Sequence, residues 1–212
     1  MSESGYLIAP DGDEGRGVLV LGSWWGLGDG VREVCDRLAD HGYVALAPDL
    51  VGEGRTTEDP DTARSWLADR DMNVVADLVQ SSATLLRSTA ATPDAPLGVV
   101  GLQMGASWAL WLASRSPEVV GAVSFFYGHQ DVDRLDLDSA VQAHFAEFDE
   151  LVPEDDKVLL SAALHLECAI VECFDYPGTS SGFAETGPTY DAAAATLAWN
   201  RTLAFLDRTL DR

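Results

Sequence analysis

The sequence predicts an α/β fold in which a mainly parallel central sheet is covered by helices on both faces. Apolar segments of strand length alternate with amphipathic segments of helical period from Gly17 onward. Several of the predicted strands are continuous apolar runs, which is typical of strands buried on both faces. The length of 212 residues suits a single domain covering residues 1–212, with room for a substantial core.

The first half of the chain supplies strands, helices and one long polar segment. Residues 29–39 carry apolar side chains at helical spacing, with Asp29 as the candidate N-cap. His41 and Gly42 follow as the end of this helix. The predicted elements are strands at 5–10, 17–21 and 43–48, helices at 29–39 and 72–87, and a polar loop at 49–71.

The second half repeats this alternation. Pro153 suits the first turn of a helix, where no backbone N–H is needed. The predicted elements are a turn at 92–96, a strand reaching Leu102, a helix through Arg115, strands at 119–127, 140–145 and 169–176, helices at 153–166 and 190–210, and loops at 131–138 and 177–188.

The centre of the chain reads Gly101-Leu102-Gln103-Met104-Gly105, a G-x-x-x-G frame between an apolar strand and a helix. This spacing is typical of a nucleophile elbow, in which a buried strand turns sharply into a helix. Small residues are needed on both sides because a Cβ would collide where the chain folds back. The central position of such an elbow holds Ser, Cys or Asp. Here it holds Gln103, which has no reactive sulfur or hydroxyl.

In a parallel sheet, ligands bind at the carboxyl ends of the strands. The predicted strand ends carry side chains that are candidates for ligand contacts. These are Ser23, Trp24 and Trp25, Gln103 with the following Met104, Tyr127 and His129, Asp149, and Ser181. Each has a structural alternative: Gln103 as filler of the turn, one of the two tryptophans as core packing, Tyr127 as a structural residue and His129 as an exposed loop residue.

Composition excludes several classes of partner. Thirteen Lys and Arg against 35 Asp and Glu give a formal net charge of −22. Such a surface repels phosphate backbones and anionic lipids, so we expect neither nucleic-acid nor membrane partners. The first residues lack the basic start and apolar core of a secretion signal, so we expect a cytoplasmic protein. The sequence gives no indication of oligomeric state.

Cofactor and metal motifs are also missing from the sequence. Cys35, Cys168 and Cys173 are scattered without C-x-x-C spacing, which favours buried free thiols over a disulfide or a metal site. No G-x-G-x-x-G or P-loop follows a strand. Among the histidines, His144 is expected to be a hydrogen-bonded core residue, with His41 at a helix end and His165 on a helix surface. We therefore expect no cofactor.

The chain resembles the dienelactone hydrolase family of α/β-hydrolases almost from end to end. Residues 20–54 are similar to the family's first strand, loop, helix and second strand, with Gly22 and Ser23 where His-Glu normally precedes Trp-Trp-Gly-Leu. The elbow is similar to the family's G-x-C-x-G, with Gln103 in place of the cysteine. The resemblance implies the α/β-hydrolase fold.

The resemblance also locates the other triad positions. Residues 144–153 resemble the segment with the triad aspartate, which Asp149 matches. The segment Tyr-Pro-Gly-Thr-Ser-Ser-Gly-Phe at 176–183 is similar to the family's YPGAGHGF and places Ser181 where the histidine belongs. Family members open lactones and related esters with a thiolate. Here only Asp149 remains of the carboxylate, cysteine, aspartate and histidine that support this chemistry.

Three functional hypotheses follow. In the first, the chain has lost covalent hydrolysis and binds a small apolar, carbonyl-bearing ligand, for a non-hydrolytic step such as cyclisation or isomerisation. The backbone N–H groups of Met104 and Trp24 would then polarise the carbonyl, and Asp149 would move a proton. In the second, the chain is a non-catalytic binding or regulatory module. In the third, Asp149 activates a water for weak hydrolysis, with Gln103 orienting it or His129 recruited as a base. For Asp149 the structural alternative is a carboxylate bonded to loop amides or to Ser181.

Overall fold

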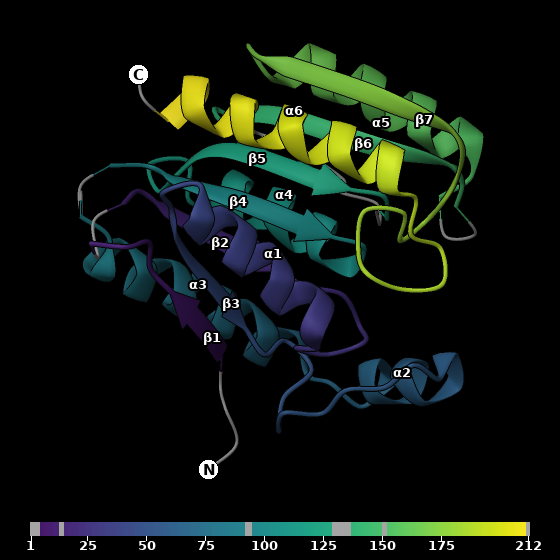
Figure 1. Ribbon diagram of the computed structural model, residues 1–212, viewed down its shortest axis with the longest axis horizontal. Helices are drawn as coiled ribbons and strands as arrows, with labels where there is room; N and C mark the ends of the chain where they lie inside the picture. Colours follow the sequence, from purple (N-terminus) through teal and green to yellow (C-terminus); the bar gives the residue numbers. More distant parts are fainter. Residues whose placement is uncertain (1–4, 13–14, 92–94, 129–136, 150–151, 211–212) are drawn as a thin grey trace.

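A computed structural model describes residues 5–12, 15–91, 95–128, 137–149 and 152–210, and the strands within these ranges form a seven-stranded sheet (Figure 1). Its strand order is β1-β3-β2-β4-β5-β6-β7, and only β1 is antiparallel to its neighbour. This confirms the predicted α/β class. The strands are β1 (Gly5–Ile8), β2 (Gly17–Leu21), β3 (Val44–Pro48), β4 (Leu97–Leu102), β5 (Val120–Phe126), β6 (Ala140–Phe148) and β7 (Val171–Ser180).

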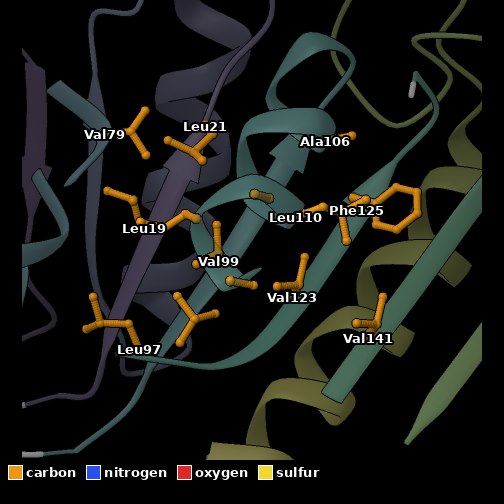
Figure 2. Packing of buried hydrophobic residues seen from close by; sticks show 14 of the residues in the cluster. Leu19, Leu21, Val79, Leu97, Val99, Ala106, Leu110, Val123, Phe125 and Val141 are labelled. Atoms are coloured by element: carbon orange, nitrogen blue, oxygen red, sulfur yellow. The ribbon is translucent and has the colours of Figure 1, made fainter. Parts of the chain in front are cut away.

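Helices cover both faces of the sheet (Figure 1). One face packs against α1 and α6, and the other against α3, α4 and α5. Figure 2 shows apolar side chains of β2, β4, β5 and β6 packed with those of α3 and α4 on the second face. The helices in the described ranges are α1 (Asp29–Asp40), α2 (Pro60–Ala68), α3 (Met72–Thr89), α4 (Met104–Arg115), α5 (Glu154–Glu167) and α6 (Ala192–Leu210).

Three details differ from the sequence prediction. The polar loop contains α2, which begins with Pro60 after the N-cap Asp59 and buries only Ala63, so no apolar period marked it. Gly28, not Asp29, is the N-cap of α1, and it offers no side-chain hydrogen bond. Strand β7 continues to Ser180 through a proline, which an edge strand tolerates because one side of its backbone needs no partner.

Other expectations hold. His41 caps the end of α1, and His165 is exposed on α5. All three cysteines are free thiols; Cys35 and Cys168 are buried as expected, whereas Cys173 is only partly buried. Among the residues that the structure describes, no helix is both long and apolar enough to span a membrane. Most of the predicted loop at 131–138 and part of the turn at 92–96 lie outside the described residues.

The passage from β4 to α4 is the tightest turn near the centre of the sheet. A Cβ on Gly105 would lie 1.8 Å from the carbonyl oxygen of Leu21, at the end of β2. A Cβ on Gly101 would lie 2.6 Å from the carbonyl oxygen of Gly105 itself. Both contacts are far below van der Waals distance, so only glycine fits at either position. The first turn of α4 is thereby pressed against the end of β2.

A buried polar network ties β6 to β7 and α6. Gln142 Nε2 donates to Glu172 Oε2 over 2.8 Å and to the carbonyl oxygen of Arg201 over 3.3 Å, which turns Gln142 Oε1 toward His144 Nε2, 2.9 Å away. His144 Nε2 therefore carries the proton, and His144 Nδ1 accepts from the hydroxyl of Tyr176 over 2.7 Å. The histidine is a fully hydrogen-bonded core residue, as predicted from the sequence.

We predict that Gly105→Ala lowers the free energy of unfolding by about 3 kcal/mol or more, because the added Cβ cannot avoid the Leu21 carbonyl. Urea denaturation measures this change. Gly187→Ala is the control, since a Cβ there meets nothing within 4 Å and its cost should stay within about 0.5 kcal/mol. Equal stability of the two variants would show that α4 does not pack as closely on β2.

We predict that the free energy of unfolding falls as the pH drops below 6.5, partly through His144. Burial lowers the pKa of His144 from 6.5 to about 3, so the unfolded chain takes up a proton that the folded chain refuses. The loss should approach about 1.4 kcal/mol per pH unit between pH 6 and pH 4. Urea titrations across this range should show a shallower pH slope in His144→Asn than in the exposed control His165→Gln. Equal slopes would mean that the folded protein protonates His144 freely.

Candidate functional site

The carboxyl ends of β4 to β7 bring the predicted triad positions together. Gly128, after β5, packs so closely on the elbow that a Cβ there would lie 2.6 Å from Cα of Gln103. The same glycine donates its backbone N–H to Oδ2 of Asp149 over 3.1 Å. Ser181 donates its N–H to the carbonyl oxygen of Phe148, the residue before Asp149, over 2.9 Å. Gln103, Asp149 and Ser181 are therefore linked through one continuous set of contacts.

Gln103 has the backbone conformation of an elbow. Its φ of 52° and ψ of −115° are rarely adopted by a residue with a side chain. The surrounding structure holds this conformation, because the N–H of Gln103 donates to Phe126 over 3.1 Å and its carbonyl accepts from Ala106 over 2.9 Å. The side-chain oxygen Oε1 is buried and has no hydrogen-bond partner among the described residues. Met104 begins α4, where the first N–H groups of a helix have no intrahelical acceptor.

The segment Ser23-Trp24-Trp25 lies beside this turn, since it follows the Leu21 carbonyl that Gly105 contacts. Ser23 is buried, and its Oγ accepts the N–H of Trp25 over 3.3 Å. The indoles of Trp24 and Trp25 meet edge to face, with centroids 5.8 Å apart, and both are partly buried. The indole N–H of Trp24 is buried without a hydrogen-bond partner in the described part of the chain.

Ser181 and Asp149 occupy the rim of the site. Both are partly exposed. The carbonyl oxygen of Ser181 accepts from the hydroxyl of Thr189 over 2.9 Å, which fixes the loop after β7. The bond from Gly128 to Asp149 agrees with the expectation that this carboxylate is bonded to loop amides. His129 lies outside the described residues.

Tyr127 and Glu185 form a hydrogen-bonded pair that was not predicted from the sequence. Tyr127 is buried, has a positive φ of 32°, and donates its hydroxyl to Glu185 Oε1 over 2.7 Å. Burial raises the pKa of Glu185 to about 7, against the opposing effect of the Tyr127 hydrogen bond. Burial and the Glu185 charge also raise the pKa of Tyr127 well above 10. In the sequence, the only sign of this pair was that Glu185 is the single acidic residue in the loop at 177–188.

None of the three cysteines is placed to replace the missing nucleophile. Burial raises the pKa of Cys35 to about 12 and that of Cys168 to about 11, so these thiols stay protonated near neutral pH. Cys173 lies near the start of β7, at the amino end of the sheet. In the described ranges, no group of three or more His, Cys, Asp or Glu is arranged to hold a metal ion.

Comparison with known proteins agrees with this geometry. The model of the dienelactone hydrolase family matches residues 4–210. "Protein usf" of Aquifex pyrophilus is 30% identical across 95% of this chain and 91% of its own. The "Putative carboxymethylenebutenolidase" of Aquifex aeolicus is 28% identical over the same shares. Among solved structures, the "Putative Dienelactone Hydrolase" of Klebsiella pneumoniae superposes with a TM-score of 0.84 at 22% identity, covering 96% of this chain and 92% of that one. The chain therefore belongs to the dienelactone hydrolase family.

Proposed function

We propose that this family member binds a small apolar, carbonyl-bearing molecule at the elbow without forming a covalent intermediate. The observation that carries the proposal is the identity and placement of Gln103. It sits in the strained conformation of an elbow centre, where hydrolases of this fold present their nucleophile. The amide nitrogen of glutamine shares its lone pair with the carbonyl, so it cannot attack an ester or lactone near neutral pH.

The other triad positions support the same conclusion. Ser181 cannot store a proton in the neutral range as an imidazole does. Asp149 remains, but its Oδ2 accepts a backbone hydrogen bond and it has no imidazole to orient at position 181. Loss of a triad typically lowers turnover by about 10⁶, leaving the contributions of binding and anion stabilisation. Covalent hydrolysis at physiological rates is incompatible with these residues.

Groups that recognise a carbonyl are retained. By resemblance to the family, the backbone N–H groups of Met104 and Trp24 are the donors for an oxyanion, and a ligand carbonyl is a matching acceptor. The buried Oε1 of Gln103 has no hydrogen-bond donor among the described residues, and an unpaired buried acceptor lowers stability by about 1–3 kcal/mol. A donor on the ligand would remove this cost. A carbonyl compound that also carries a hydroxyl satisfies both. Trp24 and Trp25 provide apolar surface next to these groups.

Proton transfer to and from such a ligand is the chemistry that this site supports. Polarising a carbonyl acidifies the neighbouring C–H bonds, and an adjacent carboxylate can accept the proton. The result is isomerisation or cyclisation without water as a reactant. This function uses the family's anion-stabilising turn while dispensing with the thiolate.

We predict that the native protein does not accelerate hydrolysis of p-nitrophenyl acetate or of a dienelactone above background. The double variant Gln103→Cys/Ser181→His regains a thiol and an imidazole next to Asp149, and should exceed the native rate at least about 100-fold. Release of p-nitrophenol and loss of dienelactone absorbance measure this. The single variant Gln103→Ala is the control and should stay at background. Native hydrolysis abolished by Asp149→Asn would contradict the proposal and identify a hydrolase that activates water.

A further inference from the structure

The Glu185 side chain lies between the end of β5 and the first turn of α1. The hydrogen-bond partner of Glu185 is Tyr127, which follows β5. Glu185 also approaches Gly30, which lies in the first turn of α1 after β2. A Cβ on Gly30 would lie 4.0 Å from Cβ of Glu185. In the sheet, β4 lies between β2 and β5. Since α1 follows β2, a side chain that reaches from the end of β5 toward the first turn of α1 passes the carboxyl end of β4, which leads into Gln103.

The chain also holds this carboxyl in place. The ring of Tyr127 packs edge-on against Phe183, with centroids 5.4 Å apart, and the backbone N–H of Glu185 donates to Gly182 over 3.1 Å. The carbonyl of Ala184 accepts the indole N–H of Trp199 from α6 over 3.0 Å. Figure 1 shows the loop that carries Glu185 curling beside the arrowheads of β4 and β5. Glu185 is partly exposed despite these contacts.

We propose that Glu185, oriented by Tyr127, is the acid–base residue of this site, exchanging a proton with the molecule bound at the elbow. This inference rests on the proposed function, in which that molecule carries a carbonyl. Tyr127 occupies Oε1, which leaves Oε2 for the proton.

The step balances without a co-reactant. The C–H bond next to the ligand carbonyl breaks, its proton goes to Glu185, and its electron pair moves through the carbonyl group to the oxygen. The resulting enolate is held by the N–H groups of Met104 and Trp24. Return of the same proton to another carbon of the conjugated system re-forms the carbonyl. An acid that ionises near pH 7 can both accept and return a proton at neutral pH.

Tyr127 and Glu33 are titratable groups that bond Glu185 or its neighbour Thr186, and the guanidinium of Arg37 from α1 lies over the ring of Trp199, 5.3 Å from its centroid. Tyr127 faces it from the end of β5, and Asp149 lies beyond Tyr127 at the end of β6. From α1, Glu33 accepts the hydroxyl of the adjacent Thr186 over 2.6 Å, and Asp29 lies in the first turn. From α6 it is approached through Trp199, which does not titrate. Within the described ranges, these neighbours give no reason for a pKa below the usual range.

A thiol introduced by Gln103→Cys tests the proposal in the ligand-free protein. Alkylation by iodoacetamide is followed from pH 5 to pH 9, and the peptide containing position 103 is quantified by mass spectrometry, which separates it from the native cysteines. Ionisation of Glu185 nearby should suppress the thiolate about tenfold relative to a single-proton curve. We expect an inflection near pH 7 in this variant.

Three further changes in the Gln103→Cys background decide the assignment. Glu185→Gln keeps an acceptor for Tyr127 and should remove the inflection, with alkylation at pH 8.5 about tenfold faster. Tyr127→Phe removes the bond that lowers the pKa of Glu185, so the inflection should move to higher pH. Glu33→Gln is the matched control and should leave it in place. Thermal unfolding confirms that each variant is folded.

An inflection that is absent from the Gln103→Cys variant, or that persists after Glu185→Gln, would overturn the proposal. A residue that only anchors Tyr127 would leave the alkylation profile with its single-proton shape. Because no ligand is present, this result is independent of the hydrolysis test: native hydrolysis would reject the proposed function without changing the titration of Glu185.

Discussion

The close contact between the first turn of α4 and the end of β2 is the constraint on which the site depends. The Leu21 carbonyl leaves no room for a side chain on Gly105, and the Gly105 carbonyl leaves none on Gly101. With the turn closed in this way, Gln103, midway between the two glycines, must take a positive φ. The same contact holds the first turn of α4 against Leu21 and Gly22, where β2 ends and its loop begins. The conformation of the elbow is therefore fixed by backbone contacts and does not depend on the chemistry of the side chain at position 103.

For this reason, the fold and the elbow can be kept when the residue at the nucleophile position has no nucleophilic atom. The conformation of Gln103 is strained, and strain of this kind is usually stored where a side chain must be presented to a ligand. Gln103 is partly buried at the elbow tip, with its Oε1 buried, and its amide lacks a nucleophilic atom. In the proposed function, carbonyl recognition by backbone N–H groups depends on α4 and the β2 loop rather than on the residue at position 103.

Buried polar contacts position the rest of the site. His144 is neutral and bonded at both nitrogens, and its carbonyl accepts the N–H of Tyr127 over 2.8 Å. Tyr127 in turn holds Glu185 from the loop after β7. A network in the core between β6, β7 and α6 thus extends through Tyr127 to the carboxyl of Glu185. The site is built by packing from the α1 and α6 side as much as by the elbow itself.

The sequence was sufficient for the sheet and for the positions around the elbow, because apolar runs and the two glycines are direct consequences of burial and close packing. It was insufficient for α2, whose helix depends on Asp59 and Pro60 rather than on an apolar face. The hydrogen bond between Tyr127 and Glu185 could not be predicted from the sequence either. These residues are distant in the chain, and their contact arises from the path of a loop that no periodic pattern encodes.

The central claim is that no acyl group becomes attached to this protein at the elbow. Intact-mass spectrometry of the native chain, quenched in acid during incubation with excess p-nitrophenyl acetate, tests it most directly. The unmodified mass throughout is the expected result. An acetyl adduct that forms at a residue of the site and decays as the ester is consumed would contradict it.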